Sequence, residues 1–146
     1  MSNELIAYCG LYCGACSFKT AYEERDREHL LRMPAKYDRW KEAPLEACPG
    51  CRLENRCGKC AIRDCAIEKR VEHCGLCGEF PCGKLLEFGG DGMPHHAEVI
   101  ANLKALTEMG PERWPAAQKA AWTCACGERF SWYLRECRKC PASRTR

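Results

Sequence analysis

The spacing of the cysteines constrains this chain more than any other feature of its sequence. The Cys-x-x-Cys pattern occurs five times, starting at Cys13, Cys48, Cys57, Cys74 and Cys137. Each such turn points two sulfurs at one centre, and a tetrahedral zinc ion needs four ligands of this kind. A single copy also fits a redox dithiol, but five copies in 146 residues favour metal binding. We therefore expect a small fold that metal ions hold together, with zinc as the leading candidate.

The composition agrees with this expectation. Cysteine occupies 15 of 146 positions, a density found where crosslinks or metals replace buried apolar area. The start Met-Ser-Asn-Glu lacks the segments of a secretory signal, and residues 5–18 are too short and too rich in cysteine and glycine to span a bilayer. We expect a soluble cytoplasmic protein without a membrane partner. Reducing conditions there favour thiolate ligands over disulfides, and an odd number of cysteines fits complete pairing poorly.

The net charge gives no separate indication of an acidic partner. Its formal value of +3 is counted without metal. A zinc ion held by four thiolates has a formal charge of −2, so two such sites would change +3 to −1. Only local clusters of basic residues therefore bear on nucleic-acid binding.

The cysteines fall into four groups along the chain. They are Cys9, Cys13 and Cys16; Cys48, Cys51, Cys57 and Cys60; Cys65, Cys74, Cys77 and Cys82; and Cys124, Cys126, Cys137 and Cys140. All fifteen are candidate metal ligands, and pairing within groups gives three closed four-thiolate sites and one three-cysteine site. An alternation of pairs between sites stays open, because only five residues separate Cys51 from Cys57.

The first group has the spacing with which radical enzymes hold an open iron–sulfur cluster. A chain of this size can hardly build the barrel that those enzymes need. An ordinary iron–sulfur cluster at Cys9, Cys13 and Cys16 stays an alternative to zinc, because thiolates suit both metals. We expect this site to be the exposed, functional one if any site is more than structural. Tyr8 and Tyr12 flank it and are expected to be core residues.

Four histidines are candidates for the missing fourth ligand of the first group: His29, His73, His95 and His96. None has a diagnostic spacing from the three cysteines. We expect His29 to face solvent from a charged helix. The other three are expected to be surface or capping residues rather than ligands.

Glycine and proline divide the cysteine-poor segments into expected helices. Within the polar residues 17–45 we predict a helix that ends before Pro34. Residues 61–70 contain no glycine or proline and predict a short helix, and residues 84–88 predict another.

Two further helices are expected after the glycine-rich residues 89–92. Pro94 suits the first turn of one helix, and Gly110-Pro111 ends it. Its apolar face comprises Val99, Ile100, Leu103 and Leu106. The other helix covers residues 111–121. Its expected packing residues are Trp114, Ala117, Ala121 and the adjoining Trp122.

Between the cysteine pairs of the fourth group, Phe130, Trp132 and Leu134 alternate with more polar residues, which is the period of a strand or hairpin. The expected fold class is a small metal-stabilised α+β fold, mostly short helices and loops around cysteine clusters, with a C-terminal β-hairpin ribbon. The expected divisions are a cysteine-rich metal-binding domain (1–92), a helical hairpin packing on it (93–123) and a zinc-ribbon-like tail (124–146).

The order of the motifs resembles a known family. The motifs are Tyr8-Cys9-Gly10-Leu11-Tyr12-Cys13-Gly14-Ala15-Cys16, Cys48-Pro49-Gly50-Cys51, Cys60-Ala61-Ile62-Arg63-Asp64-Cys65-Ala66, Cys74-Gly75-Leu76-Cys77 and Phe80-Pro81-Cys82. Over residues 5–88 they resemble a bacterial and archaeal cysteine-rich domain family of unknown function, and the resemblance implies zinc binding without implying a reaction. Trp114, Trp122 and the last cysteines look like the tail that many such chains carry. That tail usually has two residues between its first cysteines, whereas Cys124-Ala125-Cys126 has one, which weakens the expectation of four-cysteine ligation there.

Three functions follow as hypotheses. The first is a zinc-binding protein acting as a metal-stabilised binding or scaffold module, because the ligand groups are dense and no catalytic constellation is evident. The second is a metalloenzyme or iron–sulfur redox protein that uses the first cysteine group. We consider an enzyme less favoured than a binding module. The sequence does not identify a substrate, a protein partner or an oligomeric state.

The third hypothesis is nucleic-acid binding through the basic C-terminal ribbon. Basic residues surround the aromatic ones there: Arg129, Arg135, Arg138, Lys139, Arg144 and Arg146 around Phe130, Trp132 and Tyr133. The alternative, that the aromatics pack and the arginines are solvated, is favoured because such clusters are weak evidence without fold context.

Overall fold

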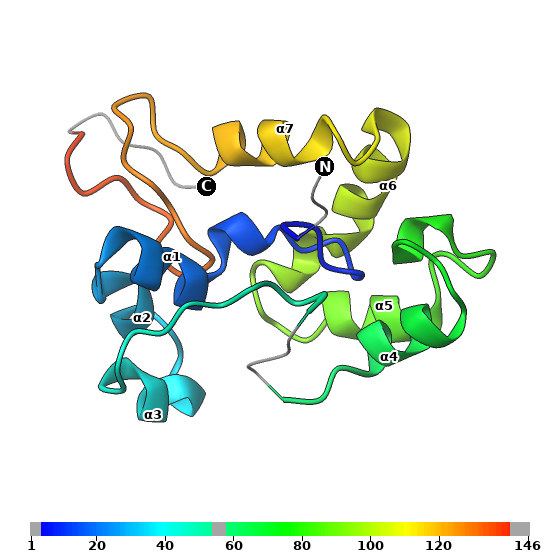
Figure 1. Ribbon diagram of the computed structural model, residues 1–146, viewed down its shortest axis with the longest axis horizontal. Helices are drawn as coiled ribbons and strands as arrows, with labels where there is room; N and C mark the ends of the chain where they lie inside the picture. Colours follow the sequence, from blue (N-terminus) through cyan, green and yellow to red (C-terminus); the bar gives the residue numbers. More distant parts are fainter. Residues whose placement is uncertain (1–3, 54–57, 141–146) are drawn as a thin grey trace. The chain divides into compact units, whose positions relative to one another are not determined.

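The protein consists of short helices joined by long loops (Figure 1). The structure, a computed structural model, describes residues 4–53 and 58–140. The chain divides into two compact units, each discontinuous in sequence: residues 1–13 with 49–116, and residues 14–48 with 117–146. No helix in the described part of the chain is long and apolar enough to cross a bilayer. The divisions at residues 92 and 123 stay a prediction.

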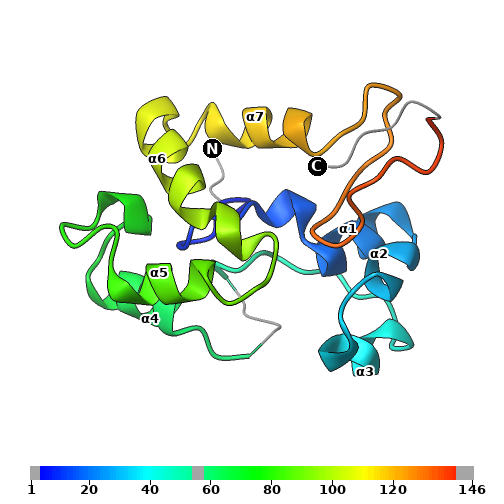
Figure 2. The ribbon, with the colours of Figure 1, turned by 180° about the vertical axis from the view of Figure 1, so that it is seen from behind.

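The first unit is built from short helices separated by loops. They are α4 (Ala61–Glu68), η3 (Cys74–Leu76), α5 (Gly83–Gly89), η4 (His96–Glu98), α6 (Val99–Met109) and the start of α7 (Trp114–Ala121). The short helices expected at residues 61–70 and 84–88 are thus present. Figures 1 and 2 show these helices from two opposite sides, and α6 packs against η3 and α5.

Helix α6 carries the core of the first unit. Val99, Leu103 and Leu106 are completely buried, as the apolar pattern predicts, while Ile100 is half-buried. The helix ends where Gly110 adopts φ +89°, a conformation that glycine takes without steric cost. Each buried leucine or valine stabilises the fold by about 1.5–3 kcal/mol relative to exposure.

The N-terminal loop packs against α6. The Asn102 side-chain amide donates a hydrogen bond to the Gly10 carbonyl at 2.9 Å. Gly10 has φ +89°, and a Cβ at this position would lie 2.7 Å from Leu103 Cγ. The Tyr12 ring meets the buried Trp114 ring edge to face, with centroids 6.1 Å apart. Tyr12 and Trp114 are therefore core residues, as expected, and they fix the loop that carries Cys9.

The second unit contains four short helices between residues 17 and 41. They are α1 (Ser17–Glu24), α2 (Glu28–Leu31), η2 (Ala35–Tyr37) and α3 (Asp38–Lys41), preceded by η1 (Cys13–Ala15), which crosses the boundary between the units in sequence. The expected single helix before Pro34 is divided, because Arg25 adopts the left-handed conformation (φ 53°) and its N–H caps α1. Helix α1 packs against α2, and α2 against α3.

The expected C-terminal β-hairpin is wrong. In the described residues the segment contains one isolated bridge, between Thr123 and Arg129, and no strand. Phe130, Trp132 and Leu134 are buried, as the alternation predicts. Their backbone groups bond elsewhere: the Trp132 N–H donates to the Ala15 carbonyl at 2.9 Å, and Ser131 and Leu134 exchange bonds within a tight turn. A loop anchored to the last residue of η1 thus reproduces the burial pattern of a strand.

Candidate metal centres

Three cysteine sulfurs converge in the second unit. The Sγ atoms of Cys124, Cys126 and Cys137 all lie within 4.8 Å of one another. We call this group the C-terminal triad. Cys137 is buried, Cys124 is half-buried and Cys126 is exposed. Soft thiolates gathered in this way form a group that can hold one thiophilic metal ion.

A tight turn allows Cys124 and Cys126 to contribute together despite their one-residue spacing. The Cys124 N–H donates to the Glu128 carbonyl at 2.8 Å, and the Gly127 N–H donates to the Cys124 carbonyl at 2.8 Å. Gly127 closes the turn with φ +95°. The Cys-x-Cys-Gly sequence was the available signal for this geometry. The spacing therefore does not prevent the two sulfurs from approaching each other.

Two backbone N–H groups and two neighbouring thiols favour the thiolate form of Cys137. Its Sγ accepts the Cys140 N–H at 3.1 Å and lies 3.5 Å from Cys126 Sγ. Burial acts to raise the pKa of Cys137, but the N–H groups of Lys139 and Cys140 and the two neighbouring thiols outweigh burial and lower it. The Glu128 backbone acts to lower the pKa of Cys126, but the Cys137 thiol, burial and the Cys124 thiol together outweigh it, so this pKa is raised. The Cys140 sulfur itself lies outside the triad.

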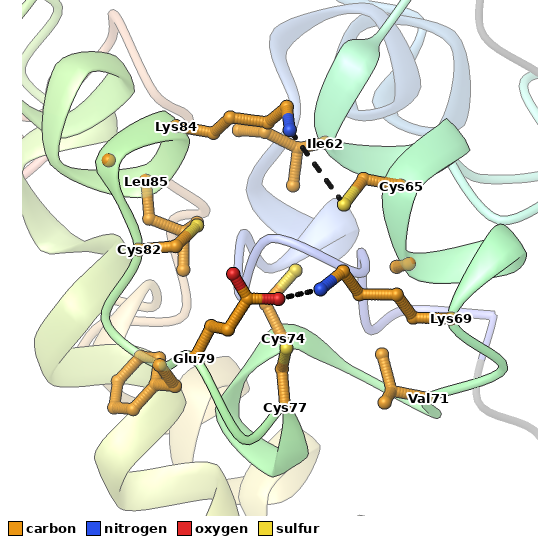
Figure 3. Close-up of a pocket in the computed structure, with 13 residues that line it drawn as sticks. Ile62, Cys65, Lys69, Val71, Cys74, Cys77, Glu79, Cys82, Lys84 and Leu85 are labelled. Atoms are coloured by element: carbon orange, nitrogen blue, oxygen red, sulfur yellow. Dashed lines mark hydrogen bonds and ion pairs between the residues drawn. The ribbon is translucent and has the colours of Figure 1, made fainter.

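A second set of cysteines surrounds a cavity of about 300 Å³ in the first unit. Four thiols line it: Cys65, Cys74, Cys77 and Cys82. Figure 3 shows their side chains around one space, with Lys84 and Lys69 at its border. We call this space the thiol cavity. It brings together the third cysteine group of the sequence, although among the described residues its sulfurs do not reach the mutual 4.8 Å spacing of the C-terminal triad.

Local structure places each of these four cysteines. Cys65 lies within α4, and Cys82 immediately precedes the first residue of α5. Cys74 and Cys77 lie at the two ends of η3, where His73 Nδ1 accepts the Gly75 N–H at 3.2 Å and shapes the turn. The Cys74 N–H donates to the Tyr8 carbonyl at 2.8 Å, which ties this turn to the N-terminal loop.

The rim of the thiol cavity is charged and its wall is apolar. Lys84 Nζ lies 4.0 Å from Cys65 Sγ, and Lys69 forms an ion pair with Glu79 (Figure 3). Ile62 and Leu85, both buried, form part of the wall. An apolar wall with cations at the rim favours thiolates over water as ligands of a metal.

Other cysteines of the first unit extend this set. Burial raises the pKa of Cys74 to about 11, and the nearby thiols of Cys82, Cys65, Cys77 and Cys60 add to the rise. Burial likewise raises the pKa of Cys9 well above its ordinary value, against the Leu11 backbone and with contributions from Cys60, Cys13 and Cys74. Cys60, which the sequence groups with Cys48 and Cys51, therefore contributes to the raised pKa of both Cys9 and Cys74. Its Sγ also caps α4 by accepting the Arg63 N–H at 3.4 Å.

The remaining cysteines lie in both units. Cys9 and Cys13 belong to the first unit, and Cys16 to the start of the second, where it is buried. Cys48 and Cys51 are half-buried, and the Cys48 carbonyl accepts Lys19 Nζ at 3.2 Å. Cys57 lies outside the described residues. Ligation by the first two groups thus stays a prediction.

The expectation that His29 faces solvent is wrong. Its residue exposure is 1%, because α2 packs it against Ser131, whose Oγ lies 2.7 Å from His29 Nδ1. His73 caps η3, as expected, but is buried. His95 is also buried, and His96 Nδ1 lies 2.7 Å from Asp91 Oδ2. In the part of the chain that is described, none of the four belongs to the C-terminal triad.

The basic residues of the C-terminal segment bind within their own unit. Arg129 Nη2 donates to the Gly14 carbonyl and to Glu23, both at 2.7 Å. Arg138 pairs with Asp26 at 2.6 Å, and Arg135 Nε donates to the Trp132 carbonyl at 2.7 Å.

Two aromatic residues of the same segment, Phe130 and Trp132, are buried. Together with the arginine contacts, their burial favours packing over nucleic-acid contact as the role of this cluster. Arg144 and Arg146 lie outside the described residues.

Comparison with known proteins identifies a family and no function. Residues 5–87, more than half of the chain, match the family described as "protein of unknown function (DUF3795)". No curated protein and no solved structure matches the chain. The match covers the thiol cavity and the N-terminal cysteines, and it ends before the C-terminal triad.

Proposed function

Because the chain belongs to the DUF3795 family, whose description assigns no activity, we propose from its own site that it is a zinc-stabilised binding or scaffold module. The observation that carries the proposal is the C-terminal triad, whose three sulfurs lie within 4.8 Å of one another. A thiophilic metal bound there would supply folding energy, since such a site does not exist in the unfolded chain.

The residues of the triad fit such an ion. Cys137 already accepts a backbone N–H, the arrangement that stabilises a thiolate before metal arrives. Cys140 is three residues further along, at the other end of the same Cys-x-x-Cys turn, and is the fourth ligand that we propose. A closed site of four thiolates is the coordination typical of structural zinc.

A binding or scaffold role is supported better than catalysis. The polar cavity next to the triad, of about 450 Å³, is lined by charges that pair with one another, including Asp26 with Arg138 and Glu128 with Arg138. His29 also lines it, but its Nδ1 is engaged by Ser131. Such internal pairing stabilises the unit around the proposed metal and occupies the charged groups that a catalytic site would need. A protein partner and a cytoplasmic location are part of the proposal.

The test is a count of metal ions by native mass spectrometry, performed on protein purified without oxygen. We expect zinc in the unaltered protein, and one ion fewer in the Cys137→Ser variant. Ala125→Ser is the matched control, because it changes an exposed residue between two ligands without removing a sulfur. An unaltered metal count in Cys137→Ser would contradict the proposal.

A further inference from the structure

We propose that Cys65, Cys74, Cys77 and Cys82 form a second metal centre, in the first compact unit, which takes a thiophilic metal through four thiolates. The inference extends the proposed function and rests on its premise that thiolates of this chain bind metal. It concerns a separate unit with its own ligands, so it can fail while the C-terminal site holds.

The donor atoms around the thiol cavity suit a thiophilic metal. All four residues line one cavity of about 300 Å³, and all four are reduced thiols. The cavity lining includes one carboxylate, Glu79, which is paired with Lys69. Its lining contains no histidine. Sulfur is therefore the ligand that the space offers, and sulfur selects zinc or an iron–sulfur cluster over magnesium or calcium.

The four proposed ligands come from three separate elements. One sulfur comes from α4, two come from the ends of η3, and one comes from the residue before α5. Figure 3 shows the four side chains entering the same space from these elements. Helix α4 has only two buried residues, Ile62 and Ala66, with which to hold its position. A metal joining α4 to η3 and α5 would supply the stabilisation that this small apolar contact lacks.

Charge at the cavity also suits four thiolates. Four thiolates around a divalent ion leave a formal charge of about −2. Lys84 lines the cavity, and its Nζ lies 4.0 Å from Cys65 Sγ, whereas Lys69 and Glu79 neutralise each other. Lys84 can offset part of the thiolate charge without acting as a ligand, because an ammonium group donates hydrogen bonds and has no lone pair.

Metal binding would contract the thiol cavity. The four sulfurs surround the space without reaching mutual spacings of 4.8 Å. Zinc–sulfur bonds of about 2.3 Å would bring them to about 3.8 Å from one another in a tetrahedron. An iron–sulfur cluster is larger than one ion and would require less contraction. We therefore expect α4 and α5 to become protected together when metal binds.

The first experiment follows thiol alkylation by iodoacetamide in the unaltered protein, with and without a chelator, read by peptide mass spectrometry. Cys65, Cys77 and Cys82 are only half-buried, so burial alone does not protect them. We expect the chelator to accelerate their alkylation at least 10-fold. Equal rates with and without chelator at these three residues would overturn the proposal, and the rates at Cys124 and Cys126 report separately on the C-terminal site.

The second experiment counts metals in variants. Cys65→Ser and Cys124→Ser should each lose the metal of one site, and the double variant should lose both. A Cys65→Ser protein that keeps the full metal count would overturn the second centre without affecting the first. Absorption of the anaerobic protein then identifies the metal, since zinc is silent and an iron–sulfur cluster absorbs visible light. If Cys65→Ser does not fold, the alkylation of the unaltered protein decides the question.

Discussion

His29 Nδ1 lies 2.7 Å from Ser131 Oγ, and this contact ties α2 to the C-terminal loop inside the second unit. The Ser17 hydroxyl lies 3.4 Å from the same serine oxygen, so α1 joins the contact. His29 and Ser131 are almost completely buried, at 1% and 0% exposure. Burial keeps the imidazole in this position neutral, because the charged form would lose its hydration and the surrounding groups do not compensate for that loss.

The first prediction is a loss of stability in mild acid that depends on His29. Burial lowers the pKa of His29 from 6.5 to about 4; Asp26 and Glu128 act to raise it, and Arg138 and Arg129 to lower it. As the pH falls below about 6.5 the unfolded chain binds a proton first, so stability is complete above that pH and declines toward pH 4. The predicted loss is at most roughly 3 kcal/mol.

Denaturant unfolding at several pH values measures this effect. His29→Asn keeps a polar atom near Ser131 but cannot take up the proton, so its stability should vary less between pH 6.5 and pH 4 than that of the unaltered protein. Ser131→Ala is the control, because it removes the contact with His29 Nδ1 and keeps the titratable imidazole, so its stability should still decline toward acid. Identical pH profiles for His29→Asn and the unaltered protein would contradict this account.

The second prediction concerns Gly10. Alanine there would need φ near +89° and would place its Cβ 2.7 Å from Leu103 Cγ, so Gly10→Ala should lower the free energy of unfolding by about 2–4 kcal/mol. Gly78 is the matched control, because a Cβ there has no atom within 4 Å. Thermal unfolding of both variants decides: equal stabilities would show that the N-terminal loop is not packed on α6 as described.

The third prediction is an order of opening after chelation. The loop between α4 and α5 has few buried apolar residues, whereas α6 buries Val99, Leu103 and Leu106. Removing metal should therefore increase hydrogen exchange in residues 65–82 before it does so in α6. Hydrogen exchange with peptide mass spectrometry measures the order. Loss of protection in α6 first would be inconsistent with metal-dependent folding of the cysteine segments.

The fourth prediction separates the scaffold role from nucleic-acid binding. Arg129 and Arg138 are paired with Glu23 and Asp26, so they are not free to neutralise phosphates. We expect no tight binding of single-stranded RNA or DNA in fluorescence anisotropy. An affinity that falls steeply as salt rises would indicate phosphate contacts and would revive that hypothesis.

The sequence predicts the helices well where glycine and proline mark their ends. Helix α6 stops at Gly110, and the apolar stripe of Val99, Leu103 and Leu106 is buried as expected. The division between α1 and α2 was not predictable, since it occurs at Arg25, which adopts a conformation that favours glycine. The prediction of a C-terminal hairpin was wrong for another reason. Alternating apolar residues indicate which side chains are buried, and a loop that is hydrogen-bonded to Ala15 buries the same side chains as a strand would.

The sequence also predicts only part of the candidate sites. Cys65, Cys74, Cys77 and Cys82, which the sequence groups by their order along the chain, line one cavity, because short helices and turns join them; that they share a metal stays a prediction. Order along the chain does not predict that Cys60 contributes to the raised pKa of Cys9, since this effect depends on tertiary packing between segments some fifty residues apart in the chain. The sequence also did not predict the burial of His29. Charged residues precede and follow it, so the segment looks solvent-exposed, although His29 and the adjacent Leu30 are both buried.

The most direct test of the central claim is X-ray absorption at the zinc edge on the protein as purified. The account predicts bound zinc with a shell of sulfur alone at about 2.3 Å, four atoms per metal. The Cys137→Ser variant should bind less zinc, and the zinc ions that stay bound should keep their sulfur ligands. A folded protein without metal, or zinc surrounded mainly by oxygen and nitrogen, would contradict the account.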